Sequence, residues 1–277
     1  MAQQPQDLAG WVTYLSSAEL PVLKHTAREL ERMRADEDNL NARSVAHVIT
    51  SDPMMTVKLL RYLQAHRRSQ TQELVQVEQG IMMMGFNAFF REIRPEPLVE
   101  DQLYGHLAAL TNLLRTVRRA QRASRYAFDW ALLLHDLHAE EIRIASLLSY
   151  LSEMLMWCFN PDAMLKIHAM QEADKTLRSA AVQQEVLGFK GAELQHALAI
   201  EWKLPELLLT LMDPAHSQNT RVRNVMLALN LARHSANGWD DAALPDDYRD
   251  IAALLRVEPE KVMAMVGASP SPSPSAA

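Results

Sequence analysis

The sequence predicts an all-α protein folded as a two-lobed helical bundle. Glycine occupies only 8 of 277 positions, which favours helices over turn-rich β folds. Apolar residues make up 48% of the chain and charged residues 22%, which is enough to build a core. Apolar side chains recur at helical spacing, and no segment shows a convincing two-residue strand period. A chain that is disordered throughout is therefore excluded.

The first part of the chain contains clear helix starts and stops. Asp52 can cap free backbone N–H groups, and Pro53 suits a first helical turn, so a helix begins there. Gly85 interrupts the pattern, and Pro95 and Pro97 forbid its continuation, which predicts a lobe boundary. The helices expected in this part cover residues 21–35, 42–50, 53–65, 77–84 and 86–93.

Longer helical patterns follow, separated by proline and glycine. They cover residues 98–128, 139–157, 161–186, 191–202, 205–213 and 220–236, with a polar connection at 238–248 and one or two closing helices within 250–266. We expect four regions: an N-terminal segment (1–14), a first helical lobe (15–95), a second lobe with closing helices (96–266) and a disordered Ser-Pro tail (267–277).

Charge, cysteine content and hydropathy bear on the partners and the compartment expected for the protein. The net charge is −6 and the pI is near 5.9, so affinity for nucleic acid or an anionic membrane would have to be local. The single cysteine, Cys158, lies in an apolar run and is predicted to pack in the core. The N-terminus lacks the pattern of a signal peptide, and no stretch approaches about 18 uninterrupted apolar residues. A cytoplasmic protein is expected, without a membrane partner.

Several motifs occur in a recognisable order. They are Leu20–Leu23, Val45–Pro53, Val57–Arg61, Val77–Phe86, Glu185–Phe189 and Glu201–Pro205. From Leu15 to His216 this order resembles the HDOD family, bacterial helical signalling modules related to the HD metal-dependent phosphohydrolases. The resemblance implies a role in control of motility, second-messenger output or gene expression. Gln64-Ala65 departs from the Asn-Ser that many relatives carry after the helix of the first lobe.

The larger departures from the resemblance fall in the second lobe. An active HD enzyme holds one or two cations with a His, a His-Asp pair and a further Asp. Ser149-Tyr150 stands where the resemblance places the His-Asp pair, and neither residue can replace those ligands. Gly191 and Met212-Asp213-Pro214 also replace frequent histidines, and no histidine lies between Leu107 and Leu134. The resemblance therefore implies a degenerate HD lobe without metal, cofactor or catalysis.

A second metal hypothesis stays open within the same region. The sequence does contain a His-Asp pair, His135-Asp136. In the resemblance, however, it falls in the loop before the apolar helix that carries the family's metal-binding pair, so we interpret it as a chance match to that motif. His135, His138 and Glu141 follow an i, i+3, i+6 spacing and could meet one cation if the segment were helical. The alternative is that these groups are solvated or cap a helix. We find no other signature of an enzyme active site.

A basic stripe is the most distinctive local feature. Five arginines and no acid lie between Thr111 and Phe128, within an arc of about 120° on a helix; they are Arg115, Arg118, Arg119, Arg122 and Arg125. Arginine forks suit phosphates and carboxylates, so such a stripe could receive a nucleotide, nucleic acid or an acidic partner helix. The alternative is a solvated face neutralised by acids of neighbouring helices. The run Met82-Met83-Met84 is interpreted as core filling.

These observations lead to one functional hypothesis and one alternative. The hypothesis is a non-catalytic regulatory protein that binds an unidentified signalling protein, with a nucleotide or second messenger as the other expected ligand. Nucleic acid is not expected, because only Tyr126 and Phe128 supply aromatic rings near the arginines. The alternative is a residual metal-dependent phosphohydrolase or a nucleotide-binding protein with an unrecognised site.

Overall fold

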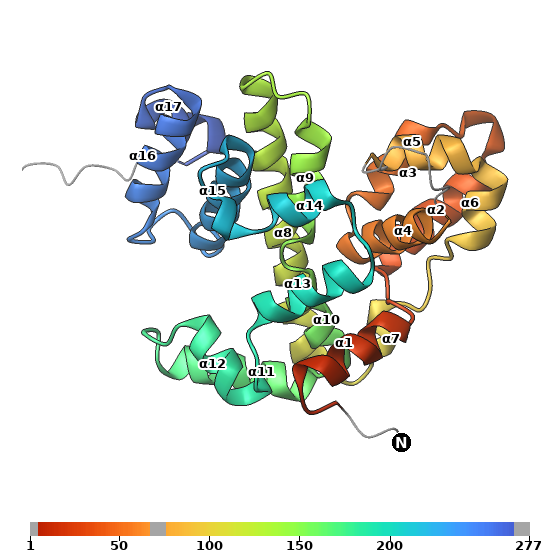
Figure 1. Ribbon diagram of the computed structural model, residues 1–277, viewed down its shortest axis with the longest axis horizontal. Helices are drawn as coiled ribbons and strands as arrows, with labels where there is room; N and C mark the ends of the chain where they lie inside the picture. The colour runs from red at the N-terminus through yellow and green to blue at the C-terminus, as the bar shows by residue number, and fades with distance from the viewer. Residues whose placement is uncertain (1–4, 67–75, 269–277) are drawn as a thin grey trace, which may run out of the picture. The chain divides into compact units, whose positions relative to one another are not determined.

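A computed structural model describes residues 5–66 and 76–268 as helices joined by short connections (Figure 1). The all-α prediction is confirmed, because the described residues contain no strand and only one isolated bridge, between Val22 and Leu98. The α-helices are α1 (Leu8–Ser17), α2 (Lys24–Ala35), α3 (Ala42–Ile49), α4 (Pro53–Ala65), α5 (Val77–Met84), α6 (Phe86–Glu92), α7 (Val99–Gln102), α8 (Leu107–Leu133), α9 (Ala139–Leu148), α10 (Leu151–Phe159), α11 (Pro161–Ala173), α12 (Ser179–Leu187), α13 (Gly191–Glu201), α14 (Glu206–Leu211), α15 (Thr220–His234), α16 (Leu244–Leu255) and α17 (Pro259–Val266). Two short 3-10 helices, η1 (Glu37–Asn39) and η2 (Pro214–His216), complete the described set.

The chain divides into two compact units, and both are discontinuous in sequence. The first comprises Met1–Arg118 and Leu148–Leu209, and the second comprises Arg119–Leu147 and Thr210–Ala277. The helix α8 contributes residues to both units. The lobe boundary expected after residue 95 stays a prediction, and each unit is described by itself below.

The first unit depends on a buried aspartate at the start of α4. The carboxylate of Asp52 accepts hydrogen bonds from the backbone N–H groups of Met54 (3.0 Å) and Met55 (3.1 Å), as the sequence predicts for an N-cap. It also accepts one from the N–H of Leu23, 29 residues away, at 2.8 Å. The residue is fully buried, so three N–H groups that water cannot reach are satisfied by one side chain. Asp52 thereby fixes the start of α4 against the start of α2.

The second unit is built from the C-terminal part of α8, α9 and α15–α17. The amide of Asn224 on α15 donates to the carbonyl oxygen of Ala127 on α8 at 3.0 Å. The rings of Tyr126 and Trp130 stack with centroids 5.9 Å apart. His234 Nδ1 lies 2.6 Å from the buried carboxylate of Asp247, which joins α15 to α16. Polar contacts between helices therefore supplement the apolar core of this unit.

Three predicted helices are divided because a local turn overrides the helical pattern, and one predicted connection is partly helical. The segment 98–128 breaks at Leu103–His106, where Gly105 has a φ of 86°, and α8 then continues to Leu133. Ser149-Tyr150 forms a turn between α9 and α10. Asp174 accepts from the N–H of Thr176 at 2.9 Å and ends α11. The connection 238–248 is shorter than expected, since α16 begins at Leu244.

Helical structure at both ends of the described chain extends across the region boundaries expected at residues 14 and 267. The helix α1 crosses the boundary set at residue 14, and Trp11 and Leu15 are buried. The N–H of Ala268 donates to the carbonyl oxygen of Met263 at 2.9 Å, so Gly267 and Ala268 complete the end of α17. The Ser-Pro segment 269–277 lies outside the described residues.

One segment is long and apolar enough to cross a membrane by length and composition alone. It spans Ala139–Phe159 with a mean hydropathy of 1.2, and 72% of the window is buried inside the folded chain. The turn at Ser149-Tyr150 divides it into α9 and α10. A segment buried among other helices has the character of the core of a folded protein, so it is weak evidence for a membrane span.

Candidate functional site

The five arginines of the predicted stripe lie on α8 but differ in exposure. Arg115, Arg118 and Arg125 are exposed, whereas Arg119 and Arg122 are half-buried. Arg115 and Arg118 belong to the first unit, and the other three belong to the second. The stripe is therefore not one uniform surface.

Arg122 is an internal structural residue of the second unit. Its guanidinium donates to the carbonyl oxygen and to the hydroxyl oxygen of Ser235, both at 3.0 Å, and to the hydroxyl of Tyr126 at 3.2 Å. It also lies 5.7 Å from the centroid of the Trp239 ring. Its donors are directed into the unit, so it is a poor candidate for contact with a partner.

Two exposed arginines have acidic neighbours in their own unit. Burial raises the pKa of Asp129, and the charge of Arg125 opposes that rise. Glu172 forms an ion pair with Lys175 at 2.6 Å, which lowers the pKa of Glu172, and Arg115 adds a smaller contribution. Part of the charge is thus neutralised within the protein, as the alternative interpretation of the stripe predicts.

In the His135-Asp136 pair, the aspartate makes contacts that stabilise the fold. Arg221 Nε lies 3.0 Å and 2.7 Å from the two carboxylate oxygens of Asp136, which also accepts the N–H of His138 at 2.9 Å. Burial acts to raise the pKa of Asp136, but the hydrogen bond and charge of Arg221 outweigh it, and the pKa lies below its ordinary value. Asp136 therefore orders the turn between α8 and α9.

The three candidate metal ligands are not brought together. His138 Nδ1 lies 3.5 Å from Glu141 Oε1, and Glu141 is buried. His135 is exposed with a φ of 53°. Within residues 5–66 and 76–268, no three His, Cys, Asp or Glu side chains form a group that could hold a metal ion. The structure thus pairs His138 with Glu141 without the third ligand of the hypothesis.

The turn that carries Ser149-Tyr150 is followed by contacts within the first unit. The N–H of Ser152 donates to the side-chain oxygen of Gln195 on α13 at 2.8 Å. The hydroxyl of Thr116 on α8 donates to Glu153 at 2.8 Å. These polar side chains join α10 to its neighbours, and they include no histidine.

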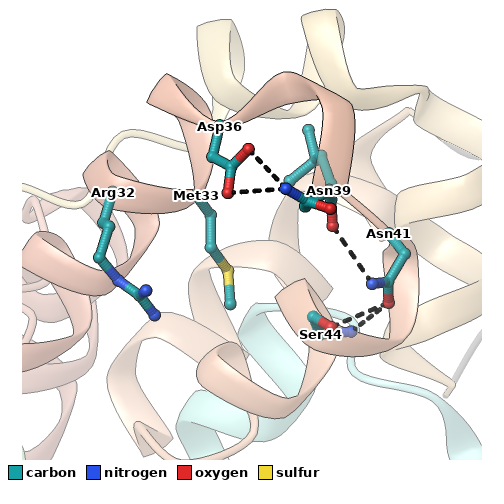
Figure 2. A pocket seen from close by; sticks show the side chains of 7 residues that line it. Arg32, Met33, Asp36, Asn39, Asn41 and Ser44 are labelled. Carbon is teal, nitrogen blue, oxygen red and sulfur yellow. Dashed lines mark hydrogen bonds between the residues drawn. The ribbon is translucent and has the colours of Figure 1, made fainter.

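A pocket of about 180 Å³ lies where α2, η1 and α3 meet, and Figure 2 shows the side chains that line it. Its lining residues are Arg32, Met33, Asp36, Asn39, Leu40, Asn41 and Ser44. Asn41 accepts the N–H of Ser44 at 2.9 Å, and Asn39 donates to Asp36 at 2.9 Å. The polar groups are engaged with one another, so the pocket has the character of a helix cap and not of a ligand site.

A model of the HDOD domain matches residues 20–218 of the sequence. The chain belongs to the HDOD family. The match covers the motifs from Leu20 to Pro205 that carry the resemblance, including Asp52-Pro53. A degenerate HD lobe in this HDOD protein stays a prediction.

Solved structures share the HDOD fold at low sequence identity. The response regulator MmoQ from Methylococcus capsulatus strain Bath has a TM-score of 0.68 and 16% identity, covering 91% of this chain and 99% of that chain. A virulence factor from Campylobacter jejuni has a TM-score of 0.64 and 19% identity, covering 95% and 93%. No curated protein matches the sequence. At such identities the likeness shows a shared fold.

Exposed apolar side chains are the features that sequence reasoning missed in this HDOD chain. Met82 and Met83 are each 63% exposed, so the core-filling interpretation of the methionine run is wrong for these two residues. Leu137 is 92% exposed in the turn after α8. Adjacent residues on a helix point in different directions, and the spacing in the sequence does not reveal which direction faces solvent.

Proposed function

We propose that the chain is a non-catalytic HDOD regulatory protein that acts by binding other proteins in the bacterial cytoplasm. One observation carries the proposal. The resemblance places Ser149-Tyr150 at the position of the metal-binding pair, and the carboxylate of the other His-Asp sequence, at Asp136, already accepts hydrogen bonds from Arg221 through both oxygens. Hydroxyl groups are poor substitutes for imidazole and carboxylate ligands. A MmoQ structure that carries the name of a response regulator is consistent with a regulatory role.

The ligand of such a protein is proposed from the exposed charge. Arg115, Arg118 and Arg125 remain accessible on α8 and suit carboxylates or phosphates. A signalling protein is the proposed partner, and a nucleotide or second messenger is the alternative ligand. Association through exposed charges weakens as salt rises, which gives a simple measurement for either ligand.

The alternative function is a residual metal-dependent phosphohydrolase. One observation favours it: His138 lies beside the buried carboxylate of Glu141 at 3.5 Å, and an imidazole with a carboxylate is part of many metal sites. His135 would have to move to complete that set. The chemistry that a metal would supply there is activation of water for attack on a phosphate ester.

Elemental analysis and a hydrolysis assay on the same sample test the two functions. The full chain is incubated with Mn²⁺, Zn²⁺ or Fe²⁺, freed of loose metal and assayed with a phosphodiester and with nucleotides. We expect less than one bound metal per chain and no hydrolysis. The variants His138→Ala and Glu141→Ala serve as controls. One metal per chain that both variants lose, with hydrolysis that they also lose, would overturn the proposal.

A further inference from the structure

The N-terminal part of α8, residues 107–118, lies in the first unit and carries a continuous row of exposed residues along one face. Its residues are Leu107, Ala108, Thr111, Arg115 and Arg118, all exposed. At about 100° per residue they span an arc of about 100°. The buried residues of the same segment, among them Leu113 and Val117, lie on the opposite side. The face is therefore the solvent side of an amphipathic helix.

This face changes in chemical character along its length. Leu107 is 76% exposed, and Tyr104, in the turn just before the helix, is 89% exposed. Ala108 and Thr111 in the middle carry short side chains. Arg115 and Arg118 follow at the other end. An apolar end, a small centre and a basic end succeed one another over three turns.

The basic end is incompletely neutralised by the first unit. Within the sequence, no acid occurs from His106 to Phe128, although the whole chain carries 34 acidic residues. Glu172, whose pKa responds to Arg115, is already paired with Lys175 at 2.6 Å. In the part of the chain that the structure describes, Arg115 donates a long hydrogen bond of 3.4 Å to Asn112 on its own helix. The charge at this end is thus available to an external carboxylate.

We infer that this face of α8 docks an acidic amphipathic helix of another protein, an inference that rests on the proposed function and specifies its partner. Carboxylates of the partner would meet Arg115 and Arg118, because guanidinium forks pair well with carboxylates. Its apolar residues would cover Leu107 and Tyr104, and the short side chains of Ala108 and Thr111 permit close approach of two helices. A second copy of this chain would present the same cations on this face and supply no carboxylate there.

Designed peptides test the inference directly with the full chain. The first probe is a fluorescent helical peptide of about 20 residues with leucines at helical spacing in one half and glutamates in the other. The second probe replaces every glutamate with lysine. Binding is measured by fluorescence anisotropy up to about 1 mM peptide. The protein variants are Arg115→Glu with Arg118→Glu, Leu107→Asn, and Arg28→Glu as a matched exposed arginine on α2 of the same unit.

We expect the acidic peptide to bind the natural chain and to lose about tenfold or more in affinity with the double arginine variant. The lysine peptide should bind that variant better than it binds the natural chain. Leu107→Asn should weaken binding of the acidic peptide to the natural chain and of the lysine peptide to the double arginine variant. Arg28→Glu should change the affinity for neither peptide. Circular dichroism of each variant reports whether it is folded, and a single Arg118→Glu variant replaces the double variant if that one unfolds.

Three outcomes would overturn the inference. The acidic peptide does not bind the natural chain, or it binds equally well after charge reversal, or the exchange of charges does not restore binding. A single-stranded oligonucleotide that binds through Arg115 and Arg118 but is insensitive to Leu107→Asn would assign the face to nucleic acid instead. Metal-dependent hydrolysis would refute the proposed function by a separate readout, and these peptide results are independent of it.

Discussion

Arg221 forms an ion pair with Asp136, which lies 85 residues earlier in the sequence; Arg221 Nε is 2.7 Å from one carboxylate oxygen and 3.0 Å from the other. The contact joins the first turn of α15 to the turn between α8 and α9. It explains why an aspartate next to a histidine here serves the fold of the second unit. Removing the charge should therefore affect stability.

Asp136→Asn should lower the free energy of unfolding of the second unit by about 1–2 kcal/mol at neutral pH. Because the pKa of Asp136 is lowered by Arg221, the stability it contributes is present above the unfolded pKa of about 4 and is lost as pH falls through the folded pKa. Urea titrations between pH 7 and pH 2 measure this. The natural chain should lose more stability than the variant below about pH 4. Parallel pH curves would refute the role of the ion pair.

Arg122→Ala should destabilise the second unit by about 2–4 kcal/mol, because it removes the donors to Ser235 and Tyr126 and uncovers Trp239. Arg125→Ala is the matched control on the same helix, one turn away and exposed, and should cost less than about 1 kcal/mol. Thermal unfolding followed by circular dichroism compares the two. Equal losses would mean that the Arg122 contacts contribute nothing specific.

Asp52→Ala should cost about 3 kcal/mol or more, since it leaves the N–H groups of Leu23, Met54 and Met55 buried and unsatisfied. Asp7 caps α1 through one bond to Gly10 at 2.8 Å and is exposed, so Asp7→Ala should cost only about 1 kcal/mol. Denaturant midpoints of the two variants give the comparison. A similar cost at both positions would show that burial adds little to this cap.

Cys158 should be unreactive in the folded chain. Burial, assisted by the charge of Asp52, raises the pKa of its thiol far above the ordinary value, and the thiolate is the reactive form. A chromogenic disulfide reagent at pH 8 should label the native protein only as fast as the first unit opens, and label the urea-unfolded protein at once. Fast labelling without denaturant would contradict the burial of this residue.

Local sequence signals predicted much of the fold. Asp52-Pro53 located the start of α4, and α5 begins and ends at the residues expected. The missed breaks at Gly105 and Asp174 arise from single turns inside an otherwise helical pattern, which periodicity averages away. The helix start at Leu244 was missed because four aspartates made the segment look like a loop.

The candidate site was less predictable, because exposure depends on contacts between distant segments. The five arginines look equivalent on a helical wheel, yet Arg122 donates a hydrogen bond to Ser235, 113 residues later in the sequence, and is half-buried. The role of Asp136 likewise depends on Arg221, which no local motif indicates. Helical spacing placed the side chains around α8, and only the tertiary contacts distinguish an anchoring arginine from an accessible one.

The interleaving of the two units along the chain has a consequence for synthesis on the ribosome. The first unit needs residues 148–209, which are made only after residues 119–147 of the second unit. Its native contacts therefore cannot be completed until the nascent chain has grown past residue 209. During that interval α9 and the end of α8 have been synthesised without α15, so the ion pair between Asp136 and Arg221 cannot yet form. A chain that ends anywhere between residues 119 and 208 would therefore leave both units incomplete.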